Sequence, residues 1–386
     1  MRKDILSAAA LLLAITALLV ALPAAASSSS SSSKTQTQAE TTYHTLALVD
    51  AKTGQVDNYL PGPDGVTSVV SDRKGGSYVG GRFDHIADVS RKGVVHLESD
   101  GTIDPIFVPD LPREMAVSPI FYRAGVVYVG DYGGKGVFAL DSRSGKRLWR
   151  TSAGNDPVHS LAFGNGVLYV GGTFAGIGGV SRPGVAALDP ATGTPTLWRV
   201  HLLGDVLGDI RPSASSIVTE KRLVYFGGEF STVNGLKREL GLAAVSSRTG
   251  RPTAWAPRRA GVARSLRGIA SILVARGQVL TGSVDREGGF AAFDARSARA
   301  LSWTKQLKGG AWALASSGDT AYLGGTTDNG FTRAGGKPAY NLASVVLPTG
   351  KFTNWRPRLG RCTDVASMAV FRGKVLVAGY FSPKAC

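Results

Sequence analysis

The chain of 386 residues carries 44 Lys and Arg against 28 Asp and Glu, which gives a formal net charge of +16 and an isoelectric point near 10.0. Such a charge suggests affinity for polyanions, but arginines outnumber lysines, a bias that genomic base composition alone can produce. The 50 glycines, the many short segments rich in Val, Leu and Tyr, and the lack of a long amphipathic stretch exclude an α-helical fold and favour an all-β one.

The first 26 residues have the pattern of a secretory signal peptide. Arg2 and Lys3 precede an apolar run over residues 5–22, and small residues follow at 24–26, so we expect cleavage after Ala26. An uncleaved membrane anchor is the alternative, because about 18 apolar residues begin to suffice for a span. No cysteine follows the run, which argues against a lipid anchor. The sequence therefore predicts a secreted, extracellular protein.

Residues 27–40 are rich in serine and predict a flexible, disordered linker. No second apolar run of membrane length occurs after it. The remaining residues, 41–386, are expected to form the folded part.

Two short motifs alternate along this folded part. The first ends a strand in a variant of Tyr-Val-Gly-Gly, and its copies lie between 41 and 56 residues apart, the length of one propeller blade. The second is a variant of Leu-Asp-x-x-Thr-Gly followed by Trp. Copies of the first are at Tyr78–Gly81, Tyr128–Asp131, Tyr169–Gly172, Tyr225–Gly228, Val279–Gly282, Tyr322–Gly325 and Leu376–Gly379. Copies of the second are at Asp50–Tyr59, Glu98–Ile103, Asp141–Trp149, Asp189–Trp198, Ser246–Trp255, Asp294–Trp303 and Leu347–Trp355.

The order of the two motifs indicates how the ends of the chain meet. The chain opens on the second motif and closes on the first, so each terminal fragment is an incomplete blade and the two together make one. We therefore predict an all-β, seven-bladed β-propeller, closed by pairing N-terminal and C-terminal strands in the last blade.

Each repeat is expected to hold four strands. In the third repeat these cover residues 158–163, 167–172, 185–189 and 196–200, and Asn165-Gly166 forms the first hairpin turn. Glycines at the end of the second strand permit close backbone approach near the centre of the ring. Two sets of residues have structural roles in this interpretation. Asp50, Asp141, Asp189 and Asp294 hydrogen-bond the adjoining turns, and Trp149, Trp198, Trp255, Trp303 and Trp355 wedge between neighbouring blades.

Three repeats share a longer template, in which an arginine follows ten residues after the motif's last glycine. The template reads Gly81-x-Phe83-x-x-Ile86, Gly172-x-Phe174-x-x-Ile177 and Gly228-x-Phe230-x-x-Val233, and it continues to Arg91, Arg182 and Arg238. It resembles the delta-60 repeat propellers of secreted bacterial proteins, a family whose function is largely unassigned. A ring of guanidinium groups is one interpretation of the arginines. The other, which we favour, is a repeated structural contact at the start of the third strand or with a neighbouring blade.

The second repeat is similar to the repeat of quinoprotein propellers. It reads Val127-Tyr-Val-Gly-Asp and then Val137-Phe-Ala-Leu-Asp, ending at Trp149. Quinoprotein dehydrogenases have eight blades and a vicinal cysteine pair, both of which are lacking here, so the resemblance implies the fold and no quinone cofactor.

No recognised catalytic motif occurs in the sequence. The five histidines, His44, His85, His96, His159 and His201, lie in different repeats with no pair at ligand spacing, so no metal or other cofactor is expected. Spacing along the sequence cannot exclude a metal site built from residues of separate blades that converge on the central channel.

The two cysteines, Cys362 and Cys386, flank a hairpin that turns at Arg372-Gly373. Residues nearly equidistant from a hairpin turn lie side by side, so a disulfide is expected in an oxidising compartment. A free, disordered Cys386 is the alternative.

Arginines gather in the long loops that leave one face of the predicted propeller. Arg258, Arg259, Arg264 and Arg267 follow Trp255, and Arg356, Arg358 and Arg361 follow Trp355. Lys237 and Arg238 lie in another loop of that face. Arginine forks bind carboxylates and phosphates well, so these are the candidate ligand-binding residues, although a solvated surface would carry the same charges.

The sequence thus favours a binding or scaffold module at the bacterial cell envelope, for an anionic glycan or a protein partner. The alternative is an extracellular hydrolase or lyase with its site at the mouth of the central channel. Nucleic acid is not an expected partner, because secretion and the lack of aromatic residues among the arginine clusters argue against it. The protein is expected to be a monomer.

Overall fold

A computed structural model describes residues 43–60, 62–86, 88–204, 211–258, 268–283, 289–328 and 330–384. All described residues belong to one unit, Thr41–Cys386. Its described residues are all-β apart from a short 3-10 helix, η1 (Ser302–Gln306). Among the described residues, no helix is long and apolar enough to cross a membrane.

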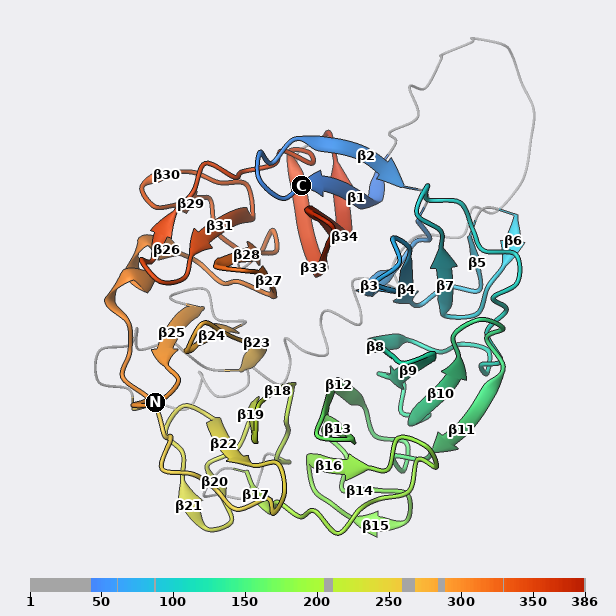
Figure 1. Ribbon diagram of the computed structural model, residues 1–386, viewed down its shortest axis with the longest axis vertical. Helices are drawn as coiled ribbons and strands as arrows, with labels where there is room; N and C mark the ends of the chain where they lie inside the picture. Colours follow the sequence, from blue (N-terminus) through green and yellow to red (C-terminus); the bar gives the residue numbers. More distant parts are fainter. Residues whose placement is uncertain are drawn as a thin grey trace, which may run out of the picture. The chain divides into compact units, whose positions relative to one another are not determined.

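Antiparallel sheets follow one another in chain order through this unit (Figure 1). Four-stranded sheets are β2 (Val56–Leu60)-β1 (His44–Asp50)-β34 (Lys374–Ser382)-β33 (Cys362–Phe371), β11 (Arg147–Thr151)-β10 (Val137–Asp141)-β9 (Val126–Asp131)-β8 (Val117–Arg123) and β27 (Ala313–Ser317)-β28 (Thr320–Gly324)-β31 (Leu342–Val346)-β32 (Lys351–Phe352). Three-stranded sheets are β3 (Val66–Ser71)-β4 (Ser77–Gly81)-β7 (Val94–Leu97), β12 (Val158–Gly164)-β13 (Val167–Gly172)-β16 (Val185–Leu188), β18 (Ser216–Glu220)-β19 (Leu223–Gly227)-β22 (Leu242–Ser246) and β23 (Ile269–Ala275)-β24 (Gln278–Ser283)-β25 (Phe290–Asp294).

Short strand pairs lie in the loops that connect the second and third strands of several repeats, and in two cases a strand from the connection before the repeat, β17 or β26, adds to the pair. They are β5 (His85–Ile86)-β6 (Val89–Ser90), β14 (Gly176–Ile177)-β15 (Val180–Ser181), β17 (Leu202–Leu203)-β20 (Thr232–Val233)-β21 (Leu236–Lys237) and β26 (Leu307–Lys308)-β29 (Arg333–Ala334)-β30 (Lys337–Pro338). Because they carry their own backbone hydrogen bonds, these loops are ordered platforms on the edge of the sheets.

One sheet is built from both ends of the described chain. Strand β1 pairs antiparallel with β34, with Leu46 opposite Ala378 and Asp50 opposite Lys374. Strand β34 continues the expected hairpin with β33, whose turn has positive φ at Arg372 and Gly373. Cys362 begins β33, but Cys386 lies outside the described residues, so the disulfide between them stays a prediction.

The expected fourth strand of the third repeat does not form. Strands β12, β13 and β16 match the first three predictions, whereas residues 196–200 hold no strand and only a single bridge joins Leu188 to Pro195. The fourth repeat shows the same bridge between Val245 and Pro252. The same isolated bridge joins Leu97 to Ile103 and Phe293 to Ala300, so the outer strand is reduced with or without a proline at the paired position. In the third repeat the Thr196 N–H still donates to the carbonyl of Ala187 at 2.8 Å.

The recurring glycines stand where another backbone comes close. A Cβ on Gly228 would lie 2.2 Å from the carbonyl oxygen of Ser213, and a Cβ on Gly172 would lie 2.2 Å from that of Pro157. These distances are far below van der Waals contact, so only glycine fits, as the motif predicts.

The recurring aspartates close the turn after the third strand. The Oδ1 atom of Asp141 accepts hydrogen bonds from the backbone N–H groups of Arg143 and Ser144, and Asp50, Asp189 and Asp294 repeat this pattern. The predicted structural role of these carboxylates is confirmed.

Tyrosine and tryptophan side chains join each repeat to the next. In four repeats the indole Nε1–H donates to a carbonyl in the following repeat's turn: Trp149 to Pro190 (2.9 Å), Trp198 to Ser246 (3.0 Å), Trp255 to Asp294 (3.1 Å) and Trp355 to Asp50 (2.8 Å). Tyrosine hydroxyls act in parallel, and Tyr322 donates to the carbonyl of Ala51 at 2.9 Å. The predicted position of these tryptophans between repeats is confirmed. Trp303 also packs between repeats, with its ring centre 6.3 Å from that of Phe352, but it lies in η1 and its Nε1 has no partner in the described structure.

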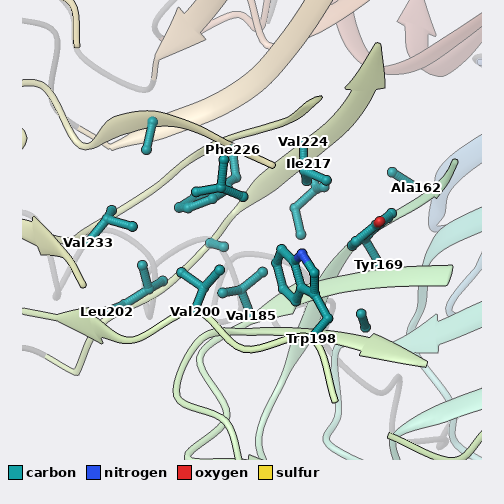
Figure 2. Close-up of a cluster of buried hydrophobic side chains, with 14 of the residues drawn as sticks. Ala162, Tyr169, Val185, Trp198, Val200, Leu202, Ile217, Val224, Phe226 and Val233 are labelled. Carbon is teal, nitrogen blue, oxygen red and sulfur yellow. The ribbon is translucent and has the colours of Figure 1, made fainter. Parts of the chain in front are cut away.

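The hydrophobic core lies in layers between neighbouring sheets. Figure 2 shows one layer, in which Tyr169 and Trp198 of the third repeat face Ile217 and Phe226 of the fourth. Tyr169 and Phe226 are fully buried. Burial of large side chains between sheets, together with the hydrogen bonds above, holds the loop platforms in fixed positions.

Candidate functional site

The predicted arginine residues separate into three groups in the structure. Arg259, Arg264 and Arg267 lie outside the described residues, and Arg258, just before that gap, is exposed. Arg358 and Arg361 are exposed in the segment between β32 and β33, whereas Arg356 is half-buried in the same segment. The second predicted cluster is therefore the one whose surroundings can be described.

Arg358 lies against an aromatic ring. Its Cζ atom is 5.3 Å from the ring centre of Tyr340, a side chain that remains 45% exposed. A guanidinium above an exposed tyrosine presents a flat apolar face and a cation together, a combination common where proteins bind partners.

Arg356 acts mainly as a structural strap. Its Nη2 donates to the carbonyl of Ala334 at 3.1 Å, which ties the segment after β32 to the β29–β30 hairpin. Burial lowers the pKa of the Arg356 guanidinium, and its Nε has no partner in the described structure. The expectation that Arg356 is a freely available ligand-binding residue is thus only partly right, because one edge of its fork is already used.

Two further cationic side chains lie beside the segment that holds Arg356 and Arg358. Lys337 Nζ donates to the side-chain oxygen of Asn354 at 2.9 Å, and the Arg333 guanidinium donates to the carbonyl of Gly336. Both residues are exposed and belong to the β29–β30 hairpin, which lies beside β31 in Figure 1. Sequence analysis missed them, because Lys337 and Arg358 lie 21 residues apart and only the contacts of the fold, from Arg356 to Ala334 and from Lys337 to Asn354, bring their segments together.

We name Arg333, Lys337, Tyr340, Arg356 and Arg358 the basic surface. Within the described ranges, no ion pair involves any of its four cations, although ion pairs form elsewhere, as between Arg211 and Asp156 at 3.1 Å. Its charge is therefore not neutralised internally, and it can bind carboxylate or phosphate groups through its exposed cations.

The three template arginines are structural. Arg91, Arg182 and Arg238 are buried, and each donates through Nη1 to the carbonyl of the preceding residue. Their Nη2 atoms donate to Asp104, Thr196 and Thr253, which follow the third strand of the same repeat. The favoured structural role is confirmed. The contact is with a carbonyl of the same repeat and not with a neighbouring blade. Lys237, next to Arg238, is exposed at the tip of β21.

His159 lies on the inner strand β12 and packs edge-on against Tyr132, with ring centres 5.2 Å apart. Its side chain retains part of its exposure, yet burial lowers the pKa of His159 to about 4. A neutral imidazole at this position is compatible with a packing role, and no carboxylate is hydrogen-bonded to it in the described structure.

Lowering the pH from 6.5 to 4 is expected to cost about 2–3 kcal/mol of unfolding free energy through His159. The unfolded chain binds this proton below about pH 6.5, whereas the folded chain binds it only near pH 4, so stability falls between these values and is constant below them. Urea unfolding at pH 7 and pH 4.5 should show a smaller loss for His159→Gln than for the wild type. The exposed His201→Gln serves as a control, and equal losses in all three proteins would contradict the prediction.

A polar cluster that the sequence did not indicate lies in the first repeat. His96 Nδ1 is 2.8 Å from Asp104 Oδ2, and His96 Nε2 is 3.4 Å from Asp72 Oδ2. Burial alone would raise the pKa of Asp104, but hydrogen bonds from His96 and from the backbone N–H groups of Ile106 and Phe107 lower it below its usual value. Histidine spacing alone could not reveal the cluster, since its partners are carboxylates 24 and 8 residues away.

Solved structures with a similar fold include the computationally designed Ika8 protein, with a TM-score of 0.54, 14% identity, and coverage of 87% of this chain and 90% of that one. U3-55K matches with a TM-score of 0.57, 14% identity, and coverage of 84% and 91%. The extracellular domain of the one component system BT4673 from B. thetaiotaomicron matches with a TM-score of 0.54, 15% identity, and coverage of 85% and 39%. At these identities the likeness shows the fold alone. A comparison with curated protein sequences finds no match.

Two family models match the sequence itself. A β-propeller domain of unknown function, DUF5122, matches residues 78–107. The model described as outer membrane protein assembly factor BamB matches residues 112–335, which is more than half of the 386 residues. The chain is therefore a quinoprotein-like β-propeller that belongs to the family of outer membrane protein assembly factor BamB.

Proposed function

We propose that this protein is a binding or scaffold module of the bacterial cell envelope, and that its basic surface receives an acidic segment of a protein partner. The observation that carries the proposal is the basic surface itself, where exposed cations and the exposed Tyr340 ring gather without an internal carboxylate to neutralise them. An anionic glycan is the second ligand of the same chemistry.

Family membership favours a protein as the partner. The family is described by a factor of outer membrane protein assembly, and assembly requires contact with other proteins. Aromatic and arginine side chains are enriched where protein interfaces carry most of their binding energy, and Arg358 stacked on Tyr340 supplies both.

Localisation at the envelope rests on the sequence of the first 40 residues. The proposal includes a signal peptide over residues 1–26, a linker over residues 27–40 and a secreted propeller over 41–386, all of which lie outside or extend beyond the described part of the chain. The described basic surface and the predicted cluster of Arg258, Arg259, Arg264 and Arg267 would then both meet envelope components.

For the architecture, we propose a seven-bladed ring of the delta-60 repeat type, closed by the sheet that both chain ends share. Contacts between inner strands support closure, since β3 contacts both β8 and β33. A repeated hydrogen bond supports it too: Ser367 Oγ accepts from the N–H of Val69 at 3.2 Å, as Ser160 Oγ accepts from Ile217 at 2.8 Å between the third and fourth repeats.

A charge-neutralised variant tests the proposed surface. The triple change Arg333→Gln, Lys337→Gln and Arg358→Gln is expected to weaken sedimentation of the purified protein with the envelope fraction of the producing bacterium by about tenfold at low salt. The wild type should itself lose binding as the salt concentration rises, because exposed charges are screened.

The matched control is Arg143→Gln, Lys146→Gln and Arg248→Gln, which removes the same charge from exposed turns elsewhere. Protease treatment of the envelope fraction distinguishes the two ligands, since it abolishes binding to a protein and leaves binding to a glycan. Equal loss of binding in the test and control triples, or none in either, would reject the basic surface as the binding site.

A further inference from the structure

The cluster around His96 has a composition that the other repeats do not share. His96 lies on β7 directly opposite Tyr78 of β4, and the two rings stack with centres 4.4 Å apart. At the same register, the tyrosines of four other repeats face small residues: Ala139, Ala187, Ala244 and Ser344. Among these five repeats, only the first has an imidazole in place of a small side chain. A structural contact common to all repeats does not explain this difference.

The donor atoms come from the end of β7 and from the segment that follows it. His96 Nδ1 lies 2.8 Å from Asp104 Oδ2, and ligand atoms of His96, Glu98 and Asp104 all lie within 4.8 Å of one another. Glu98 is two residues from His96 and so shares its face of the chain. His96 and Asp104 are buried, whereas Glu98 is exposed and leaves the cluster open to solvent.

Each aspartate has one oxygen engaged by backbone and the other facing the imidazole. Asp104 Oδ1 accepts from the N–H groups of Ile106 and Phe107, and Asp72 Oδ1 accepts from those of Lys74 and Gly75. Both carboxylates are thereby held in place before any ligand binds, which lowers the entropic cost of binding.

Within the described ranges, His96 is the only basic side chain that pairs with the carboxylates of the cluster. Three carboxylates surround one imidazole, and no Lys or Arg forms an ion pair with any of them there. Arg91 is close but donates to the backbone carbonyl of Asp104, not to its carboxylate. Buried carboxylates are costly unless a cation compensates them, and a divalent ion is the most economical one that fits beside a histidine.

We propose that His96 Nδ1, Asp104 and Glu98 bind a divalent transition-metal ion of the zinc class. Mixed nitrogen and oxygen donors suit Zn²⁺, whereas Ca²⁺ and Mg²⁺ prefer oxygen alone. Asp72 accepts the remaining ring N–H at Nε2, 3.4 Å away, the arrangement by which a carboxylate orients a metal-binding histidine. Three protein ligands leave the fourth position to water, and the exposed Glu98 can close on the ion by a rotamer change.

Zinc binding by the untagged, chelator-treated full-length protein tests this site, with isothermal titration calorimetry and the visible spectrum of bound Co²⁺ as readouts. The expected result is one equivalent of Zn²⁺, competition by Co²⁺ at the same site, and a visible spectrum typical of low-coordinate Co²⁺. The wild type should also unfold at a higher temperature with Zn²⁺, because the ion binds the folded state.

Glu98→Gln is the primary variant, because the side chain is exposed and its loss leaves the buried hydrogen bonds intact. It should bind Zn²⁺ at least tenfold more weakly, His96→Gln should bind none, and Asp72→Asn should bind about tenfold more weakly through the outer contact. The exposed Glu220→Gln serves as the matched control and should bind as the wild type does. No binding by the wild type, equal binding by Glu98→Gln, or tighter binding of Ca²⁺ than of Zn²⁺ would overturn the proposal.

Discussion

Replacing Trp355 by alanine is expected to lower the free energy of unfolding by about 4 kcal/mol. Trp355 is 2% exposed, packs edge-on against Tyr322 with ring centres 4.9 Å apart, and donates to the carbonyl of Asp50 at 2.8 Å. The substitution leaves a cavity where residues more than 300 positions apart meet, and the Asp50 carbonyl keeps only its hydrogen bond from the Gly54 N–H. Urea unfolding followed by far-ultraviolet circular dichroism, which reports on the backbone, measures the change.

A phenylalanine pair separates the two contributions at this position. Trp355→Phe keeps most of the apolar contact and should cost about 1–2 kcal/mol, largely for the lost hydrogen bond. Trp303→Phe is the control, because Trp303 Nε1 has no partner to lose. If the two phenylalanine variants were equally stable, the hydrogen bond to Asp50 would have no role in holding the chain ends together.

Gly228→Ala is expected to destabilise the protein by about 3 kcal/mol. Its Cβ would lie 2.2 Å from the carbonyl oxygen of Ser213 and 3.0 Å from the Cα of Ala214, so two backbone segments would have to separate. A flexible side chain could turn away, but a backbone within a sheet cannot move without breaking its neighbours' hydrogen bonds. Chemical denaturation of the variant and the wild type measures the difference.

Gly235→Ala in the same connection provides the contrast. Gly235 has a φ of +79°, but a Cβ there would meet no atom within 4 Å. Only conformational strain of about 1 kcal/mol is therefore expected. A loss at Gly235 as large as at Gly228 would show that backbone conformation, and not close approach, explains the glycines of the repeat.

The repeated residues were the ones whose structural roles sequence reasoning could predict. Asp141 closes its turn, Trp198 reaches the next repeat, and Gly172 admits a close backbone, all as expected. Repetition makes such roles visible because the same local geometry needs the same side chain each time. The fourth strand of the third repeat was predicted wrongly, since only an isolated bridge between Leu188 and Pro195 forms there, as between Leu97 and Ile103 in the first repeat.

The residues of the candidate sites were harder to predict. Arg358 was expected on an exposed loop, but its contact with Tyr340 and its neighbour Lys337 depend on how the β29–β30 hairpin lies against the segment after β32. Arg356 resembled its neighbours in sequence yet is half-buried as a strap. Arginines in one short segment can differ in burial, and the difference depends on which parts of the fold pack against each of them.

The sequence by itself determined the all-β fold and the repeated framework. Strand period, turn residues and glycine positions act through local geometry, and the same local geometry recurs in each repeat. The tertiary structure alone decided which charges are exposed together on the basic surface and that His96, Asp72 and Asp104 converge in the first repeat. These groups come from separate segments, and their distances follow from sheet packing and loop position, which no spacing along the chain encodes.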